Sequence, residues 1–141
     1  MSLLPANYTA VLRGVNDTTG VGLVEVYDLD DTVDSKLANI STRGLVLTDD
    51  DVLIGGIIIL GVNPTTTLVR AIGPSLPVVG ALQDPMLELY NNDGMIIASN
   101  DNWQSDQEAE IEATTLAPTN PAESASLNTL EPGAYTAVVR E

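Results

Sequence analysis

The sequence of 141 residues contains no cysteine, no histidine and no phenylalanine. Without cysteine and histidine, the chain has no disulfide, no thiolate chemistry, no Ser-His or Cys-His nucleophile and no ordinary structural zinc site. Basic residues are also scarce: 5 Lys and Arg against 20 Asp and Glu give a net charge of −15. This charge repels nucleic acid and anionic membrane surfaces and favours cations. Carboxylates, hydroxyls and a few basic side chains remain as candidate catalytic groups, and we expect no enzyme and no catalytic residues.

Long hydrophobic runs and targeting signals are missing as well. The longest apolar run, residues 52–60, is interrupted by Gly55 and Gly56, whereas a membrane-spanning helix needs about 20 residues. Residues 1–5 show neither the basic region nor the apolar region of a secretory signal. Because residues 134–141 stop inside an apolar strand pattern, we expect the sequence to be a piece of a longer protein, so the missing signal says nothing about location.

Short strand patterns dominate what is present. Apolar residues make up 44% of the chain, which is enough for a core. Gly, Pro, Asn and Asp separate short segments rich in Val, Thr and Tyr, and the turn Asn92-Asp93-Gly94 is typical of a β-hairpin. Strands are predicted at residues 8–13, 22–28, 36–42, 52–60, 66–72, 86–90, 95–99, 125–130 and 134–140, with one helix at 105–114.

This pattern predicts the fold class. Many short strands with regular turns are typical of all-β sandwiches and barrels. We expect a single domain over residues 1–141, an antiparallel β-sandwich, jelly-roll-like, of about 8–9 strands. Ser105 or Asp106 is predicted to cap the short helix. The predicted core consists of Val11, Val24, Val26, Ile40, Leu53, Ile58, Val69, Leu87, Leu89, Ile97, Leu127, Tyr135 and Val138.

One segment occurs twice. The run Leu4-Pro-Ala-Asn-Tyr-Thr-Ala-Val-Leu-Arg13 returns as Glu131-Pro-Gly-Ala-Tyr-Thr-Ala-Val-Val-Arg140, so that Tyr135 lies 127 positions after Tyr8. Such self-similarity indicates a tandem repeat. Residues 1–28 are then a hairpin equivalent to the tail of a preceding repeat, and residues 135–141 start the next copy. A weaker echo relates residues 23–28 to residues 86–91, and common strand chemistry explains it equally well.

The repeat also predicts a strand without its partner. Residues 22–28 would pair with the first copy of the repeated strand, whereas residues 135–140 would lack such a partner and expose an edge. The N-terminal hairpin could cover that edge in a closed monomer, or add to another molecule in a strand-exchanged dimer. The high effective concentration within one chain favours the monomer. The expected partners are neighbouring repeats of the parent chain, with no nucleic acid and no membrane insertion.

The segment Asp84-Pro-Met-Leu-Glu-Leu-Tyr-Asn-Asn-Asp-Gly-Met-Ile-Ile-Ala-Ser-Asn-Asp-Asn-Trp103, followed by Leu130-Glu-Pro-Gly-Ala-Tyr-Thr-Ala-Val-Val139, resembles the bacterial pre-peptidase C-terminal domain. Members of that family are small secreted β-sandwich modules appended to exported enzymes and surface proteins. Residues 36–44 and 68–76 resemble uncharacterised repeats of very large exported bacterial proteins. The resemblance implies a secreted accessory or repeat module and carries over no catalytic residues. Residues 36–76 have no counterpart in the simple pre-peptidase pattern.

Acidic loops are the candidate cation sites, because calcium binds about six to eight oxygen ligands supplied by such loops. No cofactor is expected to be required, but calcium is the cation that these loops could bind. None of the loops has EF-hand spacing, and turns with solvated side chains are the alternative. The candidate metal ligands are Asp28, Asp30, Asp31, Asp34 and Asp101, with a further acidic run at residues 49–51.

Trp103, the only tryptophan, follows the polar run Asn100, Asp101 and Asn102. An aromatic ring beside polar turn residues can stack on a sugar, so these four residues are candidate ligand-binding residues for a surface glycan. A single Trp can equally close the core beneath a loop, where its apolar area is buried. We also expect the strand arginines to pair with acidic side chains. The pairs would join Arg13, Arg70 and Arg140 to Glu25, Glu88 or loop aspartates.

Together these observations favour a non-catalytic structural or adhesive module of a secreted or cell-surface bacterial tandem-repeat protein. The alternative is a carbohydrate-binding accessory module braced by calcium.

Overall fold

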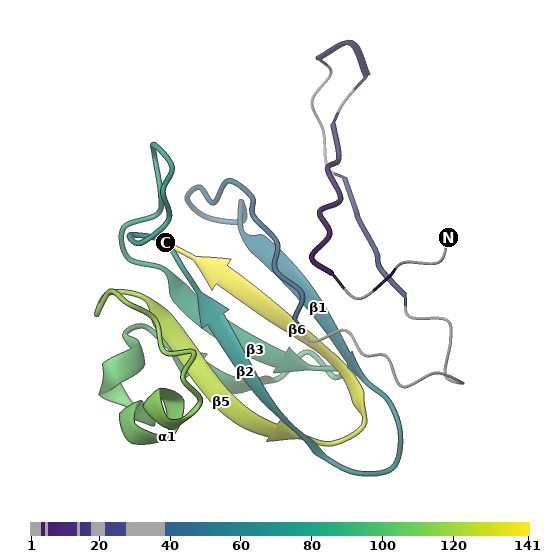
Figure 1. The fold of residues 1–141 in the computed structure, drawn as a ribbon, viewed down its shortest axis with the longest axis vertical. Helices are drawn as coiled ribbons and strands as arrows, with labels where there is room; N and C mark the ends of the chain where they lie inside the picture. Colours follow the sequence, from purple (N-terminus) through teal and green to yellow (C-terminus); the bar gives the residue numbers. More distant parts are fainter. Residues whose placement is uncertain (1–3, 5, 14, 18–21, 28–38) are drawn as a thin grey trace. The chain divides into compact units, whose positions relative to one another are not determined.

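The computed structural model describes residues 4, 6–13, 15–17, 22–27 and 39–141 (Figure 1). The chain divides into two units, Met1–Ser41 and Thr42–Glu141. Among the described residues of the first unit, the regular structure is a single 3-10 turn, Val15–Asp17. The second unit contains the strands β1 (Leu53–Ile59), β2 (Thr65–Ala71), β3 (Met86–Asn91), β4 (Ile96–Asn100), β5 (Ser124–Leu130) and β6 (Gly133–Arg140), with the 3-10 turn η2 (Trp103–Ser105) and the helix α1 (Glu108–Ala113).

The second unit is built from two antiparallel sheets, one four-stranded in the order β1-β6-β3-β4 and one two-stranded, β2-β5. The all-β class with one short helix is therefore confirmed. β6 lies between β1 and β3, so Tyr135 is opposite Ile57 on one side and Asn91 on the other. The expectation that residues 135–140 expose an unpaired edge is wrong, because this strand has a partner on both sides.

The hairpin of β3 and β4 forms at the predicted turn. The amide of Gly94 donates to the carbonyl oxygen of Asn91 at 3.0 Å, and Gly94 has φ +74°, a left-handed conformation that costs glycine little. The Asn91 side-chain oxygen accepts the amides of Asp93 and Met95 at 3.0 and 2.9 Å. The side chain of Asn91 therefore stabilises the turn by accepting two of its backbone amides.

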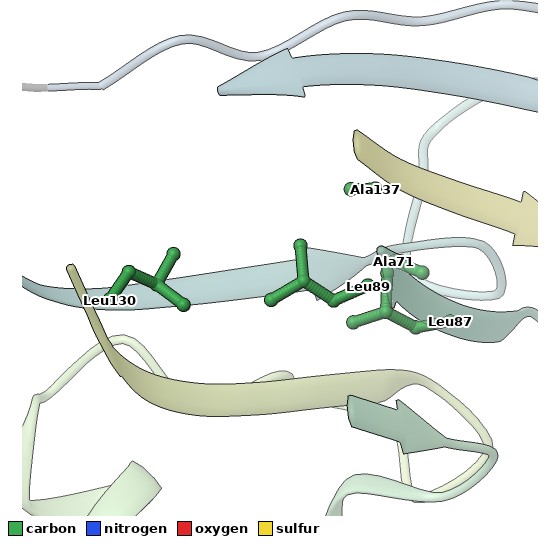
Figure 2. Close-up of a cluster of buried hydrophobic side chains, with 5 residues drawn as sticks. All are labelled: Ala71, Leu87, Leu89, Leu130 and Ala137. Carbon is green, nitrogen blue, oxygen red and sulfur yellow. The ribbon is translucent and has the colours of Figure 1, made fainter. Parts of the chain in front are cut away.

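The main core contains side chains of both sheets (Figure 2). Alternation along β3 directs Leu87 and Leu89 to one face, where they are 1% and 0% exposed. Ala71, Leu130 and Ala137 complete the buried cluster. Burying such side chains stabilises the fold by about 1.5–3 kcal/mol for each Leu.

A second cluster lies on the opposite face of the two-stranded sheet, where α1 runs beside β5 (Figure 1). Trp103 and Ile111 are buried there against Ala125, with Leu68 and Leu127 packed around them. In β2 and β5 one set of alternate residues therefore faces the main core, and the other set faces the helical segment. No helix in the described part of the chain is long and apolar enough to cross a membrane.

Six of the nine predicted strands form, with ends that differ by at most one residue. The expected strands at 8–13, 22–28 and 36–42 are not strands over their described residues, 8–13, 22–27 and 39–42. An alternating pattern produces a strand only where a neighbouring strand accepts its hydrogen bonds, and no ladder involves these residues. The strand prediction at 28 and 36–38 lies outside the described residues.

The predicted core is partly wrong. Leu87, Leu89 and Val138 are buried, and Leu53, Val69, Leu127 and Tyr135 are half-buried. Ile58 is exposed because Ile57 and Ile59 take the inward positions of β1. Ile97 is exposed because the β3–β4 register shifts there, leaving it opposite no residue. Val11, Val24, Val26 and Ile40 are also exposed, since they lie in segments without ladder partners.

The helix is shorter than predicted. α1 begins at Glu108, and Ser105 belongs to the separate turn η2. Neither Ser105 nor Asp106 is the N-cap. That position is held by Gln107, whose φ of 58° is left-handed and whose side chain makes no capping bond. The expectation of one domain over residues 1–141 stays a prediction.

Candidate functional site

The candidate ligand loop at the end of β4 begins with a buried asparagine. Asn100 is 7% exposed, and its side-chain oxygen accepts the amide of Ala125 in β5 at 3.0 Å. Its side-chain nitrogen donates to the carbonyl oxygen of Asn102 at 3.1 Å and to Ser105 Oγ at 3.4 Å. Asn100 therefore fixes its own loop to β5, and its polar atoms are used inside the protein.

Trp103 is also buried, with 6% of its surface exposed. Its indole Nε1 donates to the carbonyl oxygen of Asn120 at 3.1 Å, and its amide donates to the carbonyl oxygen of Glu123 at 2.9 Å. A buried Trp with a satisfied N–H is typical of core packing. Of the two interpretations of Trp103, the geometry fits closure of the core, because a stacking platform requires an exposed ring face.

The other two residues of the loop remain at the surface. Asp101 and Asn102 are exposed, and the Asn102 side-chain nitrogen donates to Asp101 Oδ2 at 3.3 Å. Two of the four candidate ligand-binding residues are therefore buried and two are exposed, and ligand binding at this loop stays a prediction.

A carboxylate that the sequence analysis did not identify lies next to this loop. Glu123 is 0% exposed. Its Oε1 accepts the amide of Gly73 at 3.1 Å, the amide of Ser75 at 3.0 Å and Ser75 Oγ at 2.5 Å. Its Oε2 accepts the amide of Asn120 at 3.3 Å. This one side chain joins the loop after β2 to the start of β5.

The pKa of Glu123 reflects two opposing influences. Burial is the largest single influence and raises the pKa, but the hydrogen bonds from Ser75, Asn120 and Gly73 together outweigh it and hold the pKa below its ordinary value. Because every contact is a donor, the ionised form fits the site. A carboxylate with a lowered pKa, whose oxygens already accept hydrogen bonds, is a weak general base. The Ser75–Glu123 contact is therefore suited to holding the loop rather than to activating a nucleophile.

Gly73 makes the close approach at this site possible. A Cβ atom at residue 73 would overlap the backbone carbonyl oxygen of Leu82. The run Gly73-Pro-Ser75 is therefore shaped by a backbone contact on one side and by Glu123 on the other.

The predicted arginine pairing is confirmed at one position. On the outer face of the four-stranded sheet, Glu88 Oε2 accepts Arg140 Nε at 2.7 Å and the Tyr90 hydroxyl at 2.8 Å. The Tyr90 hydrogen bond and then the Arg140 hydrogen bond lower the pKa of Glu88. Arg70 instead donates to the carbonyl oxygen of Leu116 at 2.9 Å. Beside this group, a shallow depression lined by Tyr90, Asn92, Thr136 and Val138, among others, holds no charged side chain.

The structure describes only some of the acidic loops. Asp28, Asp30, Asp31 and Asp34 lie outside the described residues. Residues 49–51 form an exposed turn in which the amide of Asp51 donates to the carbonyl oxygen of Thr48 at 3.4 Å. Within the ranges that the structure describes, no three acidic side chains come close enough to hold a metal ion. Calcium binding stays a prediction, and among the described residues Asp101 belongs to no group of three acidic side chains that could hold an ion.

Sequence reasoning missed Glu123 because nothing in the local pattern marks it. The only available sign is a lone Glu at the start of the small-residue strand Ser124–Leu130. No family model, no curated protein and no solved structure matches this chain.

Proposed function

We propose that this protein is a non-catalytic structural module of a secreted or cell-surface tandem-repeat protein. The observation that carries the proposal is a local conformation shared by the two copies of the repeated segment. The Tyr8 hydroxyl donates to the carbonyl oxygen of Leu4 at 2.8 Å, and the Tyr135 hydroxyl donates to that of Glu131 at 2.9 Å. The same bond four residues back, at an offset of 127 in the sequence, supports two copies of one structural element.

The weaker sequence similarity, between residues 23–28 and 86–91, is also accompanied by a matching hydrogen bond. The Tyr27 hydroxyl donates to Glu25 at 2.9 Å, and the Tyr90 hydroxyl donates to Glu88 at 2.8 Å. Both bonds span two residues, as expected for side chains on the same face of an extended chain. The agreement supports a common origin for residues 23–28 and 86–91.

We further propose that the second unit is most of a jelly-roll sandwich. An eight-stranded jelly roll pairs its second strand with the seventh, the seventh with the fourth and the fourth with the fifth. Its other sheet pairs the third strand with the sixth and places the eighth and then the first beside the third. If β1 is the second strand, the orders β1-β6-β3-β4 and β2-β5 agree with this scheme. The first and eighth strands would then complete the smaller sheet.

The chemistry of the candidate site supports a structural role. Asn100, Trp103 and Glu123 use their polar atoms to connect the loop after β2, the end of β4 and the segment that leads into β5. Each of these contacts holds one segment of the fold against another, which is what a repeated structural module requires.

A glycan array, read with calcium and with a chelator, tests this proposal. We expect no saturable binding, because Trp103 is buried. Saturable binding that is lost in Asn102→Ala or Asp101→Ala, and retained in the distant control Asn92→Ala, would replace the structural role with carbohydrate recognition.

A chain carrying residues 14–140 twice in tandem tests the repeat itself. Neighbouring units of a repeat protein stabilise one another across their interface, so we expect the unfolding enthalpy per copy to equal or exceed that of the single chain. A lower enthalpy per copy in calorimetry would contradict a tandem structural module.

A further inference from the structure

The two strands of the smaller sheet have very different outer edges. On the outer edge of β5, the amide of Ala125 donates to the Asn100 side chain at 3.0 Å. The amide of Leu127 donates to Gln107 Oε1 at 3.1 Å, and its carbonyl oxygen accepts Gln107 Nε2 at 2.9 Å. Side chains from β4 and the start of α1 therefore close this edge.

These bonds also determine how β2 is oriented. In an antiparallel pair, a residue that directs its amide away from its partner strand lies opposite a residue that does the same. Ala125 and Leu127 point away from β2, so their opposite residues, Arg70 and Leu68, direct their backbone groups away from β5. Thr66 has the same orientation by alternation.

The outer edge of β2 is open in the described part of the chain. Outside the β2–β5 ladder, no backbone hydrogen bond between described residues involves Thr66, Leu68 or Arg70. Unpaired backbone groups in a row are a template for another strand. In the jelly-roll scheme the strand at this edge is the eighth, the one that follows β6 in the chain.

The repeat contains a candidate for that strand. Residues 4–13 repeat the sequence of the β6 region, so the segment that follows them, residues 22–27, occupies the position after β6 in the repeat. Its Val24 and Val26 are 50% and 56% exposed. The hydrogen bond between Tyr27 and Glu25 places these two side chains on one face, which leaves the two valines on the other.

We propose that the open edge of β2 accepts, as an antiparallel strand, a segment with the sequence of residues 22–27 from a copy of this protein. Both faces of the segment suit this edge. Val24 and Val26 would join the face on which β2 presents Val69 and Ala71 to the main core. Glu25 would lie on the face of Arg70, a complementary charge.

The inference goes beyond the proposed function, because it concerns how the fold is completed rather than what the module does. Its test reads backbone amides, so a glycan that bound the protein would refute the structural role and leave this result unchanged.

Hydrogen exchange of the full chain, followed by NMR, tests the proposal with an internal reference. Val69 donates within the β2–β5 ladder, whereas the amides of Leu68 and Arg70 face the open edge. We expect Leu68 and Arg70 to be protected in the native protein. In Val24→Pro, which removes a strand amide, they should exchange about tenfold faster or more, while Val69 changes little and shows that the sheet remains folded.

The matched control is Val11→Pro, which changes a similarly exposed valine in the segment of residues 6–13. It should leave Leu68 and Arg70 unchanged. A synthetic peptide of residues 22–27, added to Val24→Pro, should restore their protection. The proposal fails if both amides exchange freely in the native chain, if Val11→Pro has the same effect as Val24→Pro, or if saturating peptide restores nothing.

Discussion

Tyr135 donates its hydroxyl to the backbone carbonyl oxygen of Glu131, four residues earlier, at 2.9 Å. The bond fixes the turn that leads from β5 into β6, because Glu131 lies between the two strands. A Tyr hydroxyl that bonds to the backbone a few residues upstream recurs in β-sandwich proteins as the tyrosine corner. In this protein the bond anchors the start of β6, one of the two inner strands of the larger sheet.

Tyr135→Phe should therefore destabilise the second unit while keeping the ring in the core. Loss of one hydrogen bond predicts a decrease in unfolding free energy of about 0.5–1.5 kcal/mol, measured by denaturant unfolding. The matched control is Tyr8→Phe, which removes the equivalent bond to Leu4 in the first unit. An equal loss in both variants, or none in Tyr135→Phe, would contradict a specific role for the corner.

Two glycine substitutions test the close approach beside Glu123. Gly73→Ala should destabilise the protein by about 1–3 kcal/mol, as overpacking does, because the new Cβ meets the carbonyl oxygen of Leu82. Gly56→Ala is the control, since a Cβ there meets no atom within 4 Å. Thermal unfolding of both variants checks this, and similar melting temperatures would show that the loop after β2 adapts freely.

The features predicted correctly from the sequence are local ones. The β3–β4 hairpin follows from Asn92-Asp93-Gly94, whose conformational preferences act within four residues. β1 illustrates the limit: the run Ile57-Ile58-Ile59 has no period, so it could not show which isoleucine faces the core. The pairing of β1 with β6 makes that choice, and pairing is a property of distant segments.

The candidate site was predictable only in part for the same reason. The sequence draws attention to residues 100–103 as a polar segment, but the burial of Asn100 and Trp103 depends on Asn120 and Ala125, which lie far along the chain. Glu123 was missed because its main partners, Gly73 and Ser75, lie 50 and 48 positions away. No local pattern reports a contact over that separation.

The ion pair on the outer face of the larger sheet should respond to salt. Arg140→Met should lower the melting temperature slightly, because Glu88 loses its Nε donor and keeps only the Tyr90 hydroxyl. The difference from the native protein should shrink in about 1 M salt, where the screening length is about 3 Å. Arg70→Met is the control, since Arg70 bonds to a backbone carbonyl oxygen. A salt-independent loss in Arg140→Met would assign its contribution to packing.

Calcium should raise the melting temperature if an acidic loop binds the ion, by mass-action linkage. Asp101 has one side-chain contact, with Asn102, and no acidic cluster lies around it among the described residues. We therefore expect Asp30→Ala, and not Asp101→Ala, to abolish the rise. Unchanged melting with millimolar calcium and with chelator would leave all these loops as solvated turns.

Among the carboxylates of the second unit, Glu123 is the one whose loss should lower the free energy of unfolding most. In Glu123→Gln the amide nitrogen is a donor that faces another donor in either orientation. At the Oε2 position it meets the amide of Asn120, and at the Oε1 position it meets the amides of Gly73 and Ser75. The expected loss of unfolding free energy is about 1–3 kcal/mol, as for a buried group left without its partner. Glu112→Gln, at an exposed position of α1, should change it by less than about 0.5 kcal/mol.

The pH dependence follows from the lowered pKa of Glu123. A carboxyl whose folded-state pKa is depressed stabilises the fold fully above its unfolded-state pKa of about 4.3, and this stabilisation is lost as the pH falls through the folded-state pKa. Stability should therefore decrease below about pH 4 more steeply in the native protein than in Glu123→Gln, as measured by melting temperature against pH. The pKa of Glu88 is also lowered, so this carboxylate should still contribute to the loss of stability at acid pH in Glu123→Gln. Parallel curves for the two proteins would mean that folding leaves the pKa of Glu123 unshifted, contrary to the four donors that surround it.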